Sequence, residues 1–129
     1  MHIPILGAAG MVGRKLTARL VAEGQLGGAA ITALTLVDVI EPAAPAGFSG
    51  PCTRYAADIA DPATAPRLVA DRPDVIFHLA AIVSGEAEVD FDKGYAVNLD
   101  GTRQLLEAIR AAHQAEGYRP RVVFTSSIA

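Results

Sequence analysis

Three glycines at a fixed spacing follow the first apolar run of the chain. The run covers residues 2–6, and Gly7, Gly10 and Gly13 follow it in the stretch Gly-Ala-Ala-Gly-Met-Val-Gly. A helix is predicted next, over residues 11–23, because apolar and charged side chains recur there with a helical period. A buried strand, a tight glycine turn and a helix in this order are typical of a dinucleotide-binding unit.

Each glycine of the turn has its own physical use. Gly7 can adopt the positive φ of a sharp reversal, Gly10 lets a pyrophosphate approach the backbone, and Gly13 lets the helix pack close to the strand. The N–H groups at the helix start, from Met11 and Val12 onward, favour an anion. Plain strand–turn–helix corners can show the same spacing, so the glycines alone leave both interpretations open.

Strand and helix patterns alternate along the rest of the chain. Further strands are predicted over residues 31–39, 53–57, 75–79 and 121–125. A helix is predicted from Asp61-Pro62 to about residue 70, and a long helix from residue 86 to about residue 115. This alternation predicts an α/β fold of three layers, a Rossmann-type doubly wound parallel sheet of order 3-2-1-4-5. Residues 1–129 are expected to form one domain.

Two local features qualify this prediction. The first helix is expected to turn Val12, Leu16 and Leu20 inward, and residues 24–28 are expected to form a glycine cap and a loop. Pro4 is unusual in a central strand because it removes a hydrogen-bond donor from the ladder.

Composition and charge exclude several classes of partner. The formal net charge of −3 gives no reason to expect nucleic acid or an anionic membrane surface, and no apolar run is long enough to span a bilayer. Cys52 is the only cysteine, which favours a reducing cytoplasm. No metal site is indicated. A homo-oligomer stays open, because an edge strand at residues 121–125 would expose an unpaired ladder.

Acidic side chains end the second and third predicted strands. Asp38 lies 25 positions after Gly13 and could accept hydrogen bonds from both ribose hydroxyls of an adenosine. No arginine follows at position 39 or 40, so the sequence favours NAD over NADP. Asp58 could receive the adenine amino group, with Ile59 covering the ring. The alternatives are an ordinary strand-end aspartate and a turn residue.

The fourth predicted strand ends in residues suited to lie under a cofactor. Leu79 is followed by Ala80 and Ala81, whose small size lets the chain pass close beneath a ligand. We interpret His78 as a packed core histidine rather than an acid or base. Asn98 is expected either to bond the backbone near this strand and hold the site, or to lie on a helix surface.

Ser126 and Ser127 end the last predicted strand. They would lie at the rim of the sheet where a nicotinamide is expected, and a hydroxyl there could bond a substrate oxygen. Two ordinary strand-end serines are the alternative.

Together these motifs resemble the extended short-chain dehydrogenase/reductase family, in its epimerase/dehydratase group. The matching segments are 7–13, Asp38, 58–59, 78–81, 98–102 and 125–127. The resemblance covers essentially the whole chain and implies NAD as the cofactor. It implies Ser127 as the catalytic serine, and the following as cofactor-binding residues: Gly7, Gly10, Met11, Val12, Gly13, Asp38, Asp58, Ile59, Leu79, Ala80, Ala81, Asn98 and Ser126.

A narrower likeness concerns residues 78–88, which are similar to D-erythronate dehydrogenases, enzymes that oxidise a four-carbon sugar acid with NAD. This likeness implies that Ser84, Gly85 and Glu86 lie beside a small-molecule sugar-acid substrate, together with Ser127.

The resemblance has one gap, the Tyr-x-x-x-Lys pair that the family uses for proton transfer. None of Tyr55, Tyr95 and Tyr118 has a lysine four positions later. The resemblance therefore implies the cofactor-binding portion of an NAD-dependent dehydrogenase, inactive by itself and lacking the substrate-binding part. A non-catalytic dinucleotide-binding or regulatory module, and a nucleotide-sugar epimerase or dehydratase, stay as alternatives.

Overall fold

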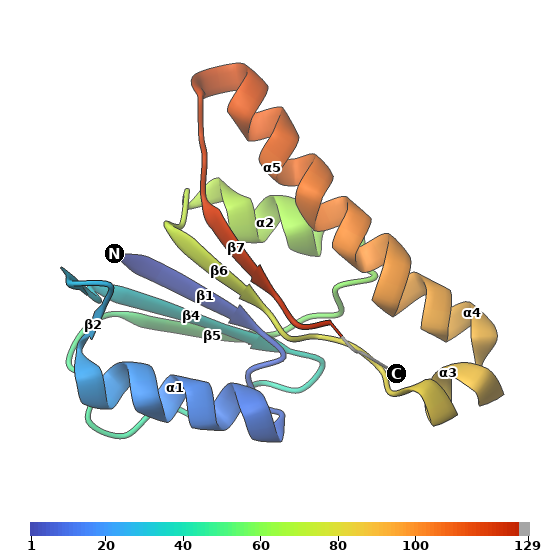
Figure 1. The fold of residues 1–129 in the computed structure, drawn as a ribbon, viewed down its shortest axis with the longest axis horizontal. Coiled ribbons are helices and arrows are strands. Elements are labelled where there is room, and N and C mark those ends of the chain that lie inside the picture. The colour runs from blue at the N-terminus through green and yellow to red at the C-terminus, as the bar shows by residue number, and fades with distance from the viewer. Residues whose placement is uncertain (127–129) are drawn as a thin grey trace.

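The computed structural model describes residues 1–126, and five of its strands form one parallel sheet (Figure 1). These are β1 (His2–Leu6), β4 (Ala33–Asp38), β5 (Cys52–Ala56), β6 (Val75–His78) and β7 (Arg121–Phe124). Their order in space is β5-β4-β1-β6-β7, with every neighbouring pair parallel. This is the 3-2-1-4-5 order predicted from the sequence, so the Rossmann-type doubly wound sheet is confirmed.

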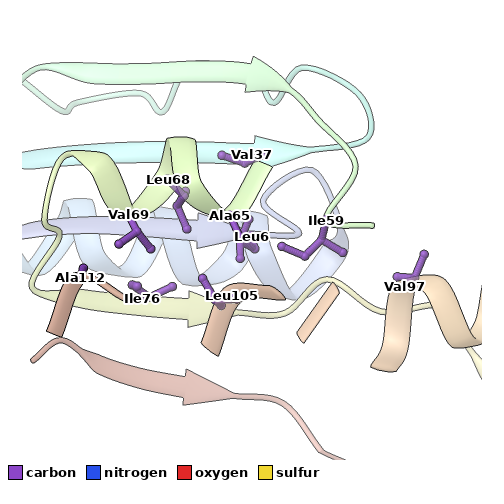
Figure 2. Close-up of a cluster of buried hydrophobic side chains, with 10 residues drawn as sticks. All are labelled: Leu6, Val37, Ile59, Ala65, Leu68, Val69, Ile76, Val97, Leu105 and Ala112. Atoms are coloured by element: carbon purple, nitrogen blue, oxygen red, sulfur yellow. The ribbon is translucent and has the colours of Figure 1, made fainter. Parts of the chain in front are cut away.

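Helices cover both faces of the sheet and make three layers. Helix α1 (Met11–Glu23) lies on one face, and α2 (Thr64–Ala70) and α5 (Thr102–Glu116) lie on the other (Figure 1). Side chains alternate along β1, so Ile3 and Ile5 join the core with Leu20 of α1, whereas Leu6 joins the opposite core. Figure 2 shows that opposite core, where Leu6, Val37 and Ile76 of the sheet meet side chains of α2 and α5.

Helix α1 buries a different set of side chains from the one predicted. Gly13, Thr17 and Leu20 are buried and Leu16 is half-buried, but Val12 is 55% exposed. The expectation that Val12 points inward is therefore wrong. Gly13 brings the helix backbone into direct contact with the turn, so the side chain one position earlier faces away from the sheet.

Residues 25–30 form a small hairpin where a loop was predicted. Strands β2 (Gln25–Leu26) and β3 (Ala29–Ala30) are antiparallel, and Gly27 and Gly28 join them with φ of 58° and 84°. A two-residue hairpin turn of this kind needs positive φ at both positions, which glycine adopts without strain. The predicted glycine cap of the first helix is confirmed at Gly24, which is left-handed. Strand β4 begins at Ala33, two residues later than predicted.

Pro4 lies within β1 but affects only one of its two ladders. β1 pairs with β4 over all five residues and with β6 over its last two. The carbonyl of His2 accepts from Asp74 N at 3.0 Å, so the backbone of His2 faces β6. Alternation along the strand turns the backbone of Pro4 to the same side. The missing donor therefore shortens the β1–β6 ladder and leaves the β1–β4 ladder intact.

The single long helix predicted from residue 86 to about residue 115 is wrong. The chain forms α3 (Ser84–Val89), α4 (Phe91–Gly94), the π-helix η1 (Tyr95–Gly101) and then α5. Asp90 interrupts the helix with φ −123° and ψ 85°, and its Oδ1 accepts from Lys93 N at 3.0 Å to begin α4. Gly94 then packs on α3, because a Cβ there would lie 2.9 Å from Cβ of Ala87.

Helix α2 begins at Thr64 rather than at Asp61-Pro62. Oδ1 of Asp61 accepts from Ala63 N at 2.8 Å and closes a turn of its own. The hydroxyl of Thr64 donates to the carbonyl of Asp58 at 2.6 Å and ties the helix start to the end of β5. Aspartate favours such turns as strongly as it favours helix caps, so the two are hard to separate from sequence.

Within residues 1–126, none of the helices combines the length and the apolarity that a membrane span requires.

Candidate functional site

The glycine turn joins β1 to α1 and is held by the neighbouring strand. Gly7 has φ of 87°, the left-handed region that the predicted reversal needs. The N–H groups of Gly7 and Ala8 both donate to the carbonyl of Val37 on β4, at 2.9 and 3.1 Å. The turn therefore has a fixed position above the carboxyl ends of β1 and β4.

The three glycines differ in what surrounds them. A Cβ at Gly13 would lie 2.1 Å from the carbonyl oxygen of Gly7, and a Cβ at Gly7 would lie 2.9 Å from Ala80 N. At Gly10, a Cβ would meet only the oxygen of Gly7, at an ordinary 3.5 Å. The fold itself thus requires Gly7 and Gly13, whereas Gly10 leaves open space beside the turn.

The start of α1 is suited to an anion. Gly10 is the N-cap residue, and no side chain among residues 1–126 caps the helix. Its first turn contains no acidic side chain. The N–H groups of Met11 and Val12 therefore keep the partial positive charge of a helix N-terminus, and both side chains are exposed. A phosphate that approaches over Gly10 would meet these groups.

Asp38 connects the end of β4 to the glycine turn. Its Oδ2 accepts from Ala9 N at 2.9 Å, and its Oδ1 accepts from Val39 N at 2.8 Å. Both carboxylate oxygens keep further lone pairs for a ligand hydroxyl. The two residues that follow are the apolar Val39 and Ile40, exposed by 67% and 65%, so no cation stands beside the carboxylate in the sequence.

These groups line one cleft of about 330 Å³ at the carboxyl ends of the strands. This is the place that the strand order predicts for a ligand. The cleft brings together many of the predicted site residues: Gly7, Gly10, Asp38, Asp58, Ile59, Leu79, Ala80, Ala81 and Glu86. Lys93 and Val97, which the sequence did not single out, also line it.

Asp58 and Ile59 form the wall of the cleft after β5. Asp58 is exposed, and its Oδ1 accepts from Ala60 N at 2.9 Å, which is the turn role considered as an alternative. Its second carboxylate oxygen has no part in that bond. Ile59 is buried beneath Gly101 of η1, where a Cβ would lie 2.8 Å from Cγ2 of the isoleucine. The isoleucine therefore contributes to the cleft mainly as packed support.

Asn98 fixes the segment that follows β6. Its side-chain oxygen accepts from Ile82 N at 2.9 Å, and its Nδ2 donates to Ile82 O at 3.0 Å. The predicted bonding of Asn98 to backbone near the fourth predicted strand is thereby confirmed. Because Ile82 lies on the cleft just after Ala80 and Ala81, the pair of bonds sets the path of the cleft floor.

His78 is a buried residue at the end of β6. Nε2 of His78 and the hydroxyl of Thr102 share a hydrogen bond of 2.9 Å, and the same hydroxyl lies 3.3 Å from Asn98 O. The Nδ1 atom has no hydrogen-bond partner among residues 1–126, and burial lowers the pKa of the ring. The histidine ring also packs edge-on against the ring of Phe124 on β7, with 5.4 Å between the two ring centroids. This is the packed histidine that the sequence predicted.

Helices α3 and α4 supply the charged wall of the cleft on the side of β6. Lys93 Nζ forms an ion pair with Oε1 of Glu86, and both side chains are about half exposed. The hydrogen bond that Lys93 Nζ donates to the carboxylate of Glu86 is the main cause of the raised pKa of Lys93. Asp90 breaks the helix between these two residues and α4 packs against α3, so the pair depends on this fold and helical spacing in the sequence does not predict it.

Four further predicted residues are either not among the residues that line the cleft or lie outside the description. Ser126 is exposed, two residues beyond β7. Gly85 is exposed on α3. Nothing is described of the side chain of Ser84, and Ser127, the predicted catalytic serine, lies outside the described residues. Among residues 1–126, the structure contains no group of three or more metal-ligating side chains close enough to hold an ion.

Comparison with known proteins gives consistent relatives. Residues 3–129 match the sequence model of a family described as the NAD dependent epimerase/dehydratase family. A D-erythronate dehydrogenase from Cupriavidus necator is 42% identical over an alignment that covers 100% of this chain and 39% of that protein. The chain spans about two fifths of the length of the curated relatives that it matches.

Solved structures share the fold closely. A nucleoside-diphosphate-sugar epimerase from Agrobacterium tumefaciens is 67% identical with a TM-score of 0.98, over 100% of this chain and 38% of that one. A UDP-glucose 4-epimerase from Brucella ovis, solved in complex with NAD, is 28% identical with a TM-score of 0.69, over 98% of this chain and 36% of that one.

Proposed function

The chain belongs to the NAD dependent epimerase/dehydratase family, and we propose that it forms the NAD-binding domain of an oxidoreductase. NAD is the cofactor of this family. The substrate that we propose is a small sugar acid such as D-erythronate, oxidised at a hydroxyl. The observation that carries the proposal is the cleft, where the open space at Gly10, the uncapped start of α1 and the carboxylate of Asp38 meet.

In this proposal the adenosine half of NAD lies toward β4 and β5. The N–H groups of Met11, Val12 and Gly13 at the start of α1 receive the pyrophosphate over Gly10. The carboxylate of Asp38 accepts hydrogen bonds from the ribose hydroxyls. Asp58 accepts from the adenine amino group through the oxygen that its turn leaves available, beside the support of Ile59.

The nicotinamide half extends toward β6 and β7. Leu79, Ala80 and Ala81 form the floor beneath it, and Asn98 keeps that floor in place through Ile82. Ser126 is proposed to lie along the cofactor.

NAD, when bound, accepts a hydride from the substrate carbon. Ser127 orients the substrate hydroxyl, and Ser84, Gly85 and Glu86 lie beside the substrate. The proton acceptor is not assigned to this chain, because none of its three tyrosines has a lysine four positions later.

A specific observation favours one second candidate, a nucleotide-sugar epimerase. The Agrobacterium tumefaciens structure described by that activity shares 67% of its aligned residues with this chain. Epimerases and dehydrogenases of the family share the cofactor half, so the residues of the cleft serve both activities. Substrate, rather than cofactor, separates the two.

Cofactor choice tests the site. Calorimetric titration of the chain should show binding of NAD and at least about tenfold weaker binding of NADP, a difference of about 1.4 kcal/mol. The reason is the carboxylate of Asp38, which would face the 2′-phosphate, with the apolar Val39 and Ile40 beside it and no cation there. Binding of NADP equal to or tighter than that of NAD would contradict this use of Asp38.

Activity tests the choice between the two reactions. NADH formation with D-erythronate and epimerisation of UDP-glucose are measured for the chain and for a version extended through a Tyr-x-x-x-Lys pair. We expect NADH formation in the extended version only, since a positioned base contributes about 10²–10⁴-fold. Epimerisation without NADH formation would favour the second candidate.

A further inference from the structure

The charges that line the nucleotide cleft are unbalanced. Three of its lining side chains are acidic, Asp38, Asp58 and Glu86, and within the part of the chain that the structure describes Lys93 is the only basic one. A dinucleotide brings two negative phosphates of its own. Three carboxylates oppose such a ligand by repulsion across the cleft, unless a cation compensates.

Lys93 is placed to provide that compensation. It lies on α4, on the β6 side of the cleft, whereas Asp38 and Asp58 follow β4 and β5 on the other side of β1. Its backbone is held by the cap from Asp90, and α4 is packed on α3 through Gly94. The helix that carries the cation therefore has a defined position at the cleft.

Glu86 is the ion-pair partner of this cation and lies on the same wall. An exposed ion pair of this kind contributes little to folding, so its location on the ligand wall needs another explanation. The charges of Asp58 and Asp90 also act on Lys93.

We infer that Lys93 is a nucleotide-binding residue that offsets the phosphate charge of the dinucleotide, and that Glu86 opposes it. The inference rests on the proposed function, since it assigns a residue to the same NAD site. It makes Glu86 a residue that limits cofactor affinity, in addition to its proposed place beside the substrate.

The two partners of the ion pair must then have opposite effects on NAD affinity. Lys93→Gln removes the favourable charge and should weaken NAD binding about two- to fivefold at low salt. Glu86→Gln removes a repulsive charge from the same wall and should tighten NAD binding by a similar factor. Lys93→Arg keeps the charge and should retain the affinity of the original chain. The Lys93→Gln effect should shrink as salt is added, because exposed charges are screened.

The matched control is the ion pair of Arg110 with Glu107 on α5, which lies outside the lining of the cleft. Arg110→Gln and Glu107→Gln change the net charge equally and should leave NAD affinity unchanged. Calorimetric titration with NAD on all five variants, with thermal melts of each, gives the comparison.

Each outcome decides the inference. Opposite effects of Lys93→Gln and Glu86→Gln support it. Weaker binding in both variants means that the pair only holds α3 to α4, and unchanged binding in both means that neither residue faces the nucleotide; either result overturns the inference. Absence of NAD binding in the unmodified chain would instead overturn the proposed function.

Discussion

At the scale of single residues, the glycine turn uses the same amino acid for different reasons. Gly7 and Gly13 are required by neighbouring backbone atoms, which a Cβ would approach to 2.9 and 2.1 Å. Gly10 has no such neighbour, so the fold does not require its lack of a side chain, and the proposed function uses that open space for the pyrophosphate. Substitutions at the three positions should therefore separate binding from folding.

Gly10→Val should abolish or strongly weaken NAD binding while the chain stays folded. The branched side chain would occupy the space over which the pyrophosphate approaches. The free energy of unfolding should fall by no more than about 1 kcal/mol, the cost of losing glycine at an N-cap. Calorimetry with NAD and urea unfolding measure the two quantities. A folded Gly10→Val variant with unchanged NAD affinity would show that the turn has no ligand role.

Gly13→Ala should mainly reduce the stability of the fold, in contrast to Gly10→Val, which should mainly reduce NAD binding. One added carbon would clash with the oxygen of Gly7 and force α1 away from the sheet, which costs about 1–3 kcal/mol in a packed interior. Urea unfolding should detect this loss before any ligand is added. Stability equal to that of the unmodified chain would mean that α1 shifts without cost, contrary to the close contact in the structure.

At the scale of elements, the π-helix η1 is the irregular part of the fold and lies beside the cleft. Seven residues in this conformation are unusual, and π-helical turns occur often at functional sites. Asn98 is on η1 and makes both of its side-chain bonds to Ile82. Through Asn98, the irregular helix is therefore connected to the cleft floor.

Asn98→Leu should release that connection. Two hydrogen bonds are lost, so the free energy of unfolding should fall by about 1–2 kcal/mol, and the amide hydrogen of Ile82 should exchange faster with solvent. Gln114→Leu, an exposed position of α5, is the control and should change neither quantity. Unchanged exchange at Ile82 in a folded Asn98→Leu variant would contradict the role of the asparagine.

The elements also show what the sequence could and could not predict. The strands follow from apolar runs, and their order follows from the alternation with helices, so the sheet was predictable. The break at Asp90 was not, because its cap competes locally with a helical pattern that continues on both sides. Asn98 of the π-helix bonds a residue 16 positions away, and a contact between such distant residues is not visible in the periodicity of the sequence.

The candidate site was predicted where it depends on the ends of strands, and it was missed where it depends on contacts between distant residues. Gly7 and Gly10 follow β1, and Asp38 ends β4, so the predicted strands were enough to suggest these residues. The structure places all three on one cleft. Lys93 was missed because it reaches the cleft only when α4 packs against α3. Its distance from Glu86 along the chain does not indicate this packing.

At the scale of the whole molecule, His78 joins three parts of the fold. It ends β6, which lies between β1 and β7 in the sheet. Its ring shares a hydrogen bond with Thr102 of α5 and packs against Phe124 of β7. The side chain is 1% exposed, and burial lowers its pKa from the ordinary 6.5. The folded state therefore keeps the ring neutral at pH values where an unfolded chain would already bind a proton.

Acidification should consequently destabilise the whole domain through this residue. The unfolded chain takes up the proton as pH falls through 6.5, while the folded chain takes it up only at lower pH, so stability declines over that window. His78→Gln should remove this part of the decline, although His2, whose pKa burial also lowers, keeps its own share. Urea unfolding at several pH values measures the difference. Identical pH slopes for the two proteins would contradict this role of His78.

Asp38 accepts two backbone hydrogen bonds, and this affects any attempt to redesign the cofactor preference of this domain. The carboxylate that would discriminate between the two dinucleotides also accepts a hydrogen bond from Ala9 N in the glycine turn. Replacement by alanine or glycine would remove the discrimination and leave that N–H without its acceptor, so a gain in tolerance for NADP would be offset by a looser turn. Serine or asparagine keeps an acceptor oxygen, which makes them better starting points for such engineering than the smaller residues.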